Sequence, residues 1–150
     1  MAARRLVQLA PGVNPGDAIT NEIRIIDRYF QSAPFHELFS DTAVFAEHIH
    51  ESLTDFAQPA SRYNPRPGDF VLYHYGIAAR ITERVRSWSE VQRALIYHNI
   101  TPAEYYRPYS LYVAGRLERA RRDLRGLRDS FDLVFADSRF NGAELAAFGF

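Results

Sequence analysis

The chain has 150 residues, the size of one domain, and its 47% hydrophobic and 24% charged residues are ordinary for a soluble globular protein. Its 18 basic and 18 acidic residues give a formal net charge of zero, so no global attraction to nucleic acid is expected. The sequence holds no cysteine and no lysine, which excludes disulfides, cysteine-ligated metals, thiolate nucleophiles and Schiff-base lysine chemistry.

A first strand is predicted over residues 5–9, followed by a loop over residues 11–16 and a helix that Asp17 can cap. This helix has one apolar face, at Ile19, Ile23, Ile26 and Phe30. Gly16 would let a ligand approach the backbone, and the free N–H groups of the first helical turn attract phosphate. The loop lacks the Gly-x-Gly-x-x-Gly pattern of dinucleotide sites. Taken alone, it is better explained as a tight turn with a helix cap.

Four further strands are predicted at short apolar runs, over residues 42–46, 70–73, 94–97 and 131–136. Helices are expected over residues 79–88, after Thr101 in a capping box with Glu104, near Ser110, and after Ser138. The helix near Ser110 has one apolar face, at Leu117, Ala120, Leu124 and Leu127. Short apolar strands that alternate with helices predict an α/β fold. We expect one Rossmann-like three-layer sandwich with a mainly parallel sheet of at least five strands.

Polar residues follow four of the strands: Glu47-His48, His74, His98-Asn99 and Asp137-Ser138. The carboxyl ends of parallel strands meet at one edge of a sheet, and open α/β folds bind ligands there. His74 and His98 should end neighbouring strands. One histidine alone would be explained by a bond to a backbone carbonyl, but the pair with Asn99 favours a polar floor for a sugar or phosphate. No histidine pair has helical metal-ligand spacing, so no metal is expected.

Two clusters have two interpretations each. The tyrosines after His98 either stack on a sugar or an apolar acceptor or cover the core near Pro108, and the sequence favours neither: Tyr105, Tyr106, Tyr109 and Tyr112. Arginines crowd the helix after Ser110, where helix-spaced ion pairs such as Glu118–Arg122 and Arg119–Asp123 favour a solvated face. Contact of this helix with anionic lipid headgroups is the less favoured alternative.

Several segments resemble the N-terminal half of bacterial family-four glycosyltransferases, which are retaining, nucleotide-sugar-dependent enzymes with the two-domain GT-B architecture. The resemblance extends in order across nearly the whole chain, at residues 15–19 with Asn21, 73–75, 95–102, and 136–138 with Asn141. Its most specific part is the His-Asn-Ile-Thr-Pro string at residues 98–102.

The resemblance implies a domain that holds a sugar or lipid-linked acceptor and needs no cofactor. It implies that the loop at Gly16 and Asp17 approaches the donor diphosphate. His98 would be the residue in the catalytic centre, where it points toward the transferred sugar and positions it rather than acting as nucleophile or base. The other substrate-binding residues that it implies are Asn21, His74, Tyr75, Asn99, Ser138 and Asn141, the last two at the rim.

Such enzymes continue into a second domain that carries the basic residues for the diphosphate and a Glu-x7-Glu motif, and the sequence up to Phe150 contains neither. We therefore expect residues 1–150 to be a single acceptor-side domain that lacks the donor domain and is inactive alone. A nucleotide sugar would bind only together with the missing domain, and the exposed domain face would favour self-association. The apolar start, broken at Pro11, is too short for a signal peptide, so a cytoplasmic location is expected, with peripheral membrane contact left open.

Two rival functions stay open. One is a stand-alone Rossmann-like ligand-binding or interaction module, although a receiver-like version lacks the acidic cluster expected after the first strand. The other is an independent small-molecule enzyme that uses His74 and His98 as acid and base.

Overall fold

The computed structural model describes residues 4–150, apart from the side chain of His36, so the first three residues of the N-terminal segment considered above lie outside the description. The strands are β1 (Arg5–Val13), β2 (Asp41–Ile49), β3 (Gln58–Pro59), β4 (Asp69–Tyr75), β5 (Gln92–Tyr97) and β6 (Leu133–Ala136). The α-helices are α1 (Ala18–Gln31), α2 (Ile81–Ser87), α3 (Leu111–Asp123) and α4 (Arg139–Ala147). Within the described residues, none of the helices is long and apolar enough to cross a membrane.

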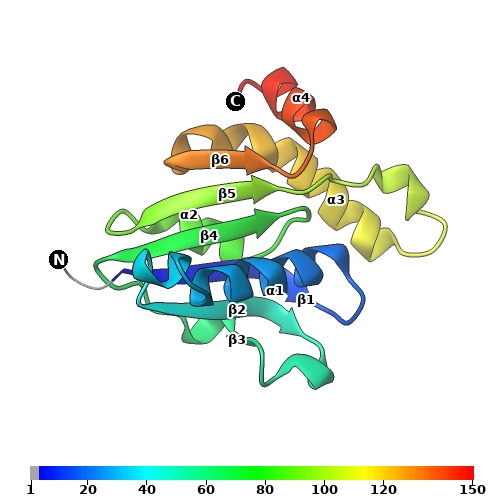
Figure 1. Cartoon of the computed structure of the whole chain (residues 1–150). Helices are drawn as coiled ribbons and strands as arrows, with labels where there is room; N and C mark the ends of the chain where they lie inside the picture. The colour runs from blue at the N-terminus through cyan, green and yellow to red at the C-terminus, as the bar shows by residue number, and fades with distance from the viewer. Residues whose placement is uncertain (1–3) are drawn as a thin grey trace.

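The six strands form one parallel sheet in the order β3-β2-β1-β4-β5-β6 (Figure 1). The chain moves outward from β1 through β2 to β3, returns to the other side of β1, and continues through β4 and β5 to β6. The direction of winding therefore reverses between β1 and β4, and in doubly wound sheets such a reversal opens a crevice at the carboxyl ends of the strands. The prediction of a Rossmann-like α/β sandwich is confirmed.

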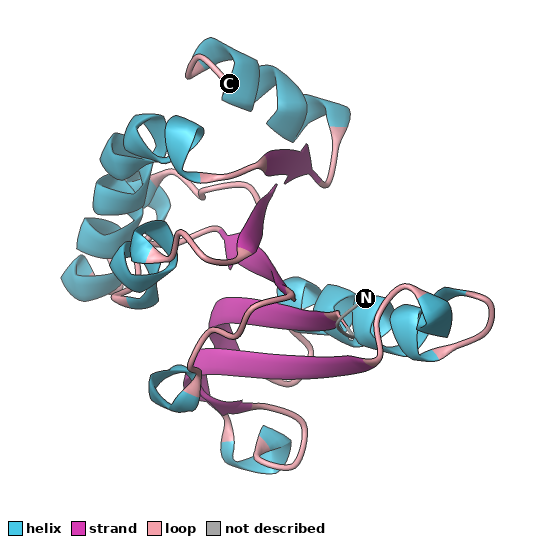
Figure 2. Cartoon of the chain, turned by 90° about the vertical axis from the view of Figure 1, so that its left-hand side faces the viewer, coloured by secondary structure: helices cyan, strands magenta, loops and turns pink. Residues whose placement is uncertain are grey.

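Helices cover the two faces of the sheet, because successive side chains of a strand point to opposite faces (Figure 2). In β4, Val71 and Tyr73 pack with α2 and α3, whereas Phe70 and Leu72 lie on the face of α1. The apolar stripe of α1 predicted from its spacing packs on this second face, where Ile23 is fully buried. The apolar stripe of α1 packs on one face of the sheet, and the alternation of side chains along the strands supplies apolar residues to both faces. Together they produce the three layers of helix, sheet and helix.

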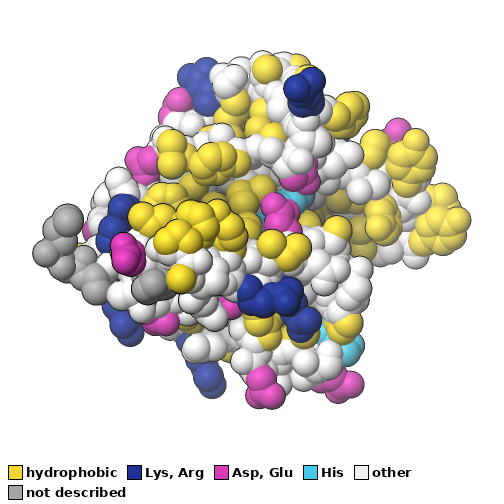
Figure 3. All heavy atoms as spheres, in the orientation of Figure 1, with side chains coloured by type: hydrophobic (Ala, Val, Ile, Leu, Met, Phe, Trp, Pro, Cys, Tyr) yellow, Lys and Arg dark blue, Asp and Glu magenta, His cyan; other side chains and the backbone are white. Residues whose placement is uncertain are grey.

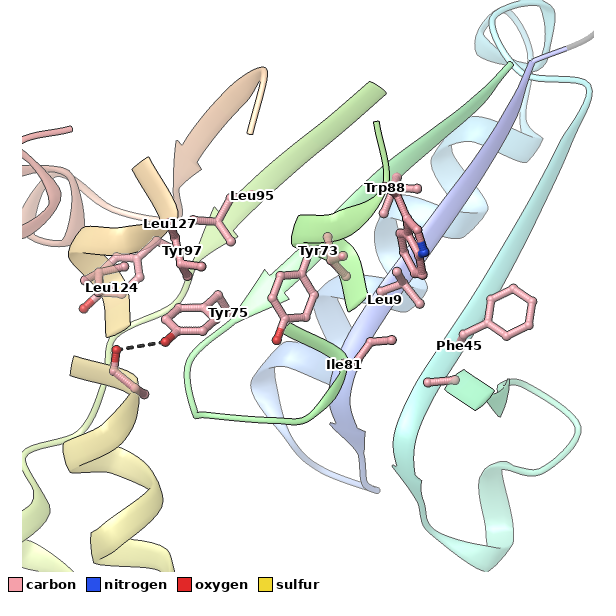
Figure 4. Close-up of a cluster of buried hydrophobic side chains, with 14 of the residues drawn as sticks. Leu9, Phe45, Tyr73, Tyr75, Ile81, Trp88, Leu95, Tyr97, Leu124 and Leu127 are labelled. Carbon is pink, nitrogen blue, oxygen red and sulfur yellow. Dashed lines mark hydrogen bonds between the residues drawn. The ribbon is translucent and has the colours of Figure 1, made fainter. Parts of the chain in front are cut away.

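The main core lies between the sheet and the helices α2 and α3, and aromatic side chains fill much of it (Figure 4). Tyr75 is completely buried there, and its hydroxyl donates a hydrogen bond of 2.8 Å to the carbonyl of Ala120 in α3. Burial raises the pKa of Tyr75, so the phenol stays protonated and keeps this bond. The predicted face of α3 is confirmed, since Leu117 and Ala120 are buried in the same core.

Two local predictions were wrong. The loop expected at residues 11–16 is shorter, because β1 continues alongside β2, pairing Gly12 with His48. The capping box at Thr101 does not form. Pro102 has an extended backbone with ψ of 130°, so only a single 3₁₀ turn (Ala103–Tyr105) follows and it has no side-chain cap.

Candidate functional site

The loop between β1 and α1 is a tight turn that ends in a helix cap. The carboxylate of Asp17 accepts hydrogen bonds of 2.9 Å from both the backbone N–H and the hydroxyl of Thr20. Gly16 has a φ of +74°, a conformation that favours glycine. Because the Asp17 carboxylate uses the donors that would attract an anion, the loop at Gly16 can approach a ligand but offers little to a phosphate.

The two histidines predicted at neighbouring strand ends meet in the structure. His74 is in β4, His98 directly follows β5, and the backbone N–H of His98 donates to the carbonyl of Tyr75 at 2.8 Å. The imidazole rings are hydrogen bonded to each other, with His74 Nδ1 3.0 Å from His98 Nε2. The pair is therefore one unit, buried on the α1 face of the sheet.

A chain of hydrogen bonds fixes which nitrogen of each ring carries a proton. The amide nitrogen of Gln8 in β1 donates to the Ile23 carbonyl of α1 at 3.0 Å, so its oxygen faces His74 Nε2 at 3.1 Å. His74 Nε2 must therefore be the donor, and His74 Nδ1 accepts a hydrogen bond from Nε2–H of His98. This assignment leaves Nδ1 of His98 as the nitrogen that faces the sheet edge.

His74 acts behind the site and not in it. Its side chain is fully buried, and burial together with the neighbouring His98 lowers its pKa to about 3. At neutral pH it is uncharged, and both of its nitrogens are already hydrogen bonded. The expectation that His74 contacts substrate is corrected, because no surface is left for a ligand, and the pairing of His74 and His98 as acid and base is disfavoured for the same reason.

Two carboxylates lie beside the outward nitrogen of His98. Nδ1 is 3.3 Å from Asp137 Oδ2 and 3.5 Å from Glu22 Oε2, and the His98 side chain is only 6% exposed. The second oxygen of Asp137 accepts a hydrogen bond from the side-chain amide of Asn141. The backbone N–H of Asn141 donates to Ser138 Oγ at 3.1 Å, which caps α4 as predicted. Ser138 and the buried Asn141 thus hold Asp137 in place.

The other predicted residues differ in which face of the sheet they lie on and in how exposed they are. Tyr75 was expected to bind substrate, but it is a core residue whose side chain points to the opposite face from His74. Asn21 and Asn99 are exposed near the carboxyl edge, where a ligand can reach them.

Gln8 and Glu22 were not predicted. Gln8 is a lone polar residue in an apolar run, and Glu22 lies on the apolar stripe of α1, and these two irregularities were the available signals.

A cavity of about 230 Å³ lies at the reversal point between β1 and β4, lined by residues of the 14–17 loop and by Gly76. A β-carbon at Gly76, which lines this cavity, would lie 3.4 Å from the β-carbon of His98, so the histidine lies close to the cavity. A larger cavity of about 580 Å³ lies toward the amino end of the sheet, lined by Arg5, Asp41 and their neighbours. We take the smaller cavity as the site, because open α/β sheets bind ligands at their carboxyl edge.

The tyrosine segment does not cover the core. The segment that joins β5 to α3 projects from the body of the domain (Figure 1). Four tyrosine side chains of this segment and of the first turn of α3, residues 105–112 and here called the tyrosine segment, are between 42% and 87% exposed: Tyr105, Tyr106, Tyr109 and Tyr112. In the arginine-rich helix, the predicted ion pair of Arg119 and Asp123 forms at 3.2 Å. Glu118 pairs with Arg107 of the tyrosine segment and not with Arg122 as expected.

Donor atoms of Glu22, His74 and His98 lie within 4.8 Å of one another, which is close enough to consider a metal. The lone pair of His74 Nδ1 is already directed at His98 Nε2, so a metal between these rings would have to displace that hydrogen bond. The arrangement therefore fits a hydrogen-bonding site better than a metal centre.

Comparisons of the chain with protein-family models, curated proteins and solved structures found no match.

Proposed function

We propose that this chain is the acceptor-binding N-terminal half of a retaining glycosyltransferase that uses a nucleotide sugar. The observation that carries the proposal is the position of His98, which the Gln8–His74 chain holds with Nδ1 toward the carboxyl edge. Segments far apart in the sequence meet around it: α1 supplies Glu22, and the turn after β6 supplies Asp137.

This arrangement suits the recognition of a sugar. Hydroxyl groups of a sugar both donate and accept hydrogen bonds, and the two carboxylates and His98 Nδ1 accept them. Asn99 and Asn21 add amide groups at the exposed rim, and the cavity beside Gly76 gives room for part of the ligand. In this proposal His98 positions the sugar, and no residue of the chain acts as a nucleophile.

The leaving diphosphate needs cationic groups, since stabilising the developing negative charge is the main catalytic requirement. The carboxyl edge of this sheet carries the acidic residues Asp17, Glu22, Glu47 and Asp137. Arg116 also lines the cavity, but its Nε donates a hydrogen bond of 2.8 Å to the carbonyl of Ala78. In the proposal, the cations therefore come from a second domain, and this domain alone does not transfer sugar. On the α1 side of β6, Leu133 and Phe135 are each 48% exposed, and in the proposal they meet that domain or a second copy of the chain.

The test is a pair of titrations of the folded chain. Saturation-transfer NMR with simple glycosides should show weak binding, and calorimetry with UDP-glucose and GDP-mannose should show no micromolar binding. Micromolar binding of a nucleotide sugar, or sugar transfer by the purified chain, would contradict the half-enzyme proposal. No binding of any saccharide would instead favour a stand-alone module for another class of ligand.

A further inference from the structure

The outward end of the histidine chain has three acceptor groups and no donor of its own. His98 Nε2–H donates its hydrogen bond to His74 Nδ1, which leaves the lone pair of His98 on Nδ1. Around that lone pair lie Asp137 Oδ2 at 3.3 Å and Glu22 Oε2 at 3.5 Å. Figure 3 shows a recessed histidine flanked by acidic side chains on this face.

A doubly protonated His98 is the obvious alternative, because an imidazolium would satisfy the carboxylates itself. Charge-assisted N–H···O hydrogen bonds are typically about 2.7–2.9 Å long. The two separations here, 3.3 and 3.5 Å, are both longer than that range. Neither carboxylate accepts a hydrogen bond from His98 Nδ1 at these distances, so the geometry favours a shared donor supplied from outside.

We infer that this site takes a primary ammonium group, so that the acceptor in the proposed function is an amino sugar or a related amino alcohol. An ammonium group carries three N–H donors, one for each of the three acceptors, whereas a hydroxyl carries only one. Its charge also complements the two carboxylates, whose side chains are 35% and 34% exposed and can be reached from solvent. A phosphate would meet only acceptors here and is excluded on the same ground.

The burial of His98 points to the same ligand group. Its side chain is only 6% exposed, which favours a small ligand group at Nδ1. A primary amine on a sugar ring is small enough, whereas its acetamide has lost the charge and two of the three donors. The inference rests on the proposed function for the sugar, and on the three acceptors for the amine.

The test compares three sugars by NMR titration: glucosamine, N-acetylglucosamine and glucose. Hydrogen bonds to charged groups are worth more than neutral ones, so glucosamine should bind at least about tenfold more tightly than the other two. Asp137→Asn and Glu22→Gln should each lower this ratio toward one. Glu104→Gln, which removes an exposed carboxylate shortly after His98, is the matched control and should leave the ratio unchanged.

The outcomes separate this inference from the proposal on which it rests. Equal binding of glucose and glucosamine would overturn the ammonium site and leave the sugar site standing, whereas no saccharide binding would overturn both. A second measurement needs no ligand: ¹⁵N NMR of the His98 ring at neutral pH should show a proton on Nε2 only. A ring protonated on both nitrogens would overturn the inference directly.

Discussion

The hydrogen-bonded chain behind His98 can be tested by His74→Leu. The substitution removes two hydrogen bonds of 3.0 and 3.1 Å and leaves His98 Nε2–H and Gln8 Oε1 without partners in a buried site. Each orphaned buried group costs about 1–3 kcal/mol, and the better burial of an apolar side chain offsets part of the sum. We therefore expect a loss of about 2–4 kcal/mol in the free energy of unfolding, measured by urea denaturation.

A double-mutant cycle separates the chain from a general loss of packing. Combining Gln8→Leu with His74→Leu removes both groups of the Gln8–His74 hydrogen bond, each of which one single variant leaves without a partner. The double variant should therefore lose about 2–3 kcal/mol less than the sum of the single variants. The matched control is His48→Leu, because His48 lies at the same edge but has a 58% exposed side chain and should change stability by less than about 0.5 kcal/mol. A loss below about 0.5 kcal/mol for His74→Leu, or simple additivity, would refute the hydrogen-bonded chain.

Three further predictions concern the scaffold. Burial alone would raise the pKa of Asp69, but hydrogen bonds from Arg5 and Tyr63 hold this pKa below its ordinary value of 3.8. The ionised carboxylate therefore stabilises the fold above pH 3.8, and this contribution is lost as the pH falls through the lower pKa of the folded state. Urea midpoints of the wild type and Asp69→Asn should differ at neutral pH and converge in acid, and a constant difference would contradict this. Tyr75→Phe should cost about 1 kcal/mol in urea denaturation through the lost bond to α3, and an unchanged midpoint would count against it. Ser138→Ala should cost about 1 kcal/mol through the lost cap and also shift the amide signals of Asp137 in NMR spectra, which should stay fixed if the cap does not hold that residue.

Much of the fold followed from local patterns. The short apolar runs predicted five of the six strands, and the helical stripes at Ile23 and Leu117 predicted which faces of α1 and α3 are buried. The sixth strand, β3 (Gln58–Pro59), has only two residues, too few for any periodicity. The capping box at Thr101 failed because Pro102 also suits an extended backbone, and the sequence pattern does not distinguish the two conformations.

The sequence predicted that the site lies at the carboxyl edge of the sheet, but it did not predict all the residues that form the site. Strand tips at one edge located His98, because a parallel sheet brings them together whatever its details. The roles of His74 and Tyr75 depend on which face of β4 each side chain occupies and on what packs there, and a run buried on both faces has no alternation to show this. Glu22 joins the site only through the packing of α1 on the sheet, which is a tertiary contact.

In the proposed function, a sugar binds at the carboxyl edge of the sheet beside His98. The most direct measurement is a titration of the ¹⁵N-labelled chain with glucosamine, followed through the backbone amides. We predict saturable shifts at Asn14 and Gly76, which line the cavity, and at Asn99, which follows His98. Shifts confined to the larger cavity at the amino end, around Arg5 and Asp41, would contradict it.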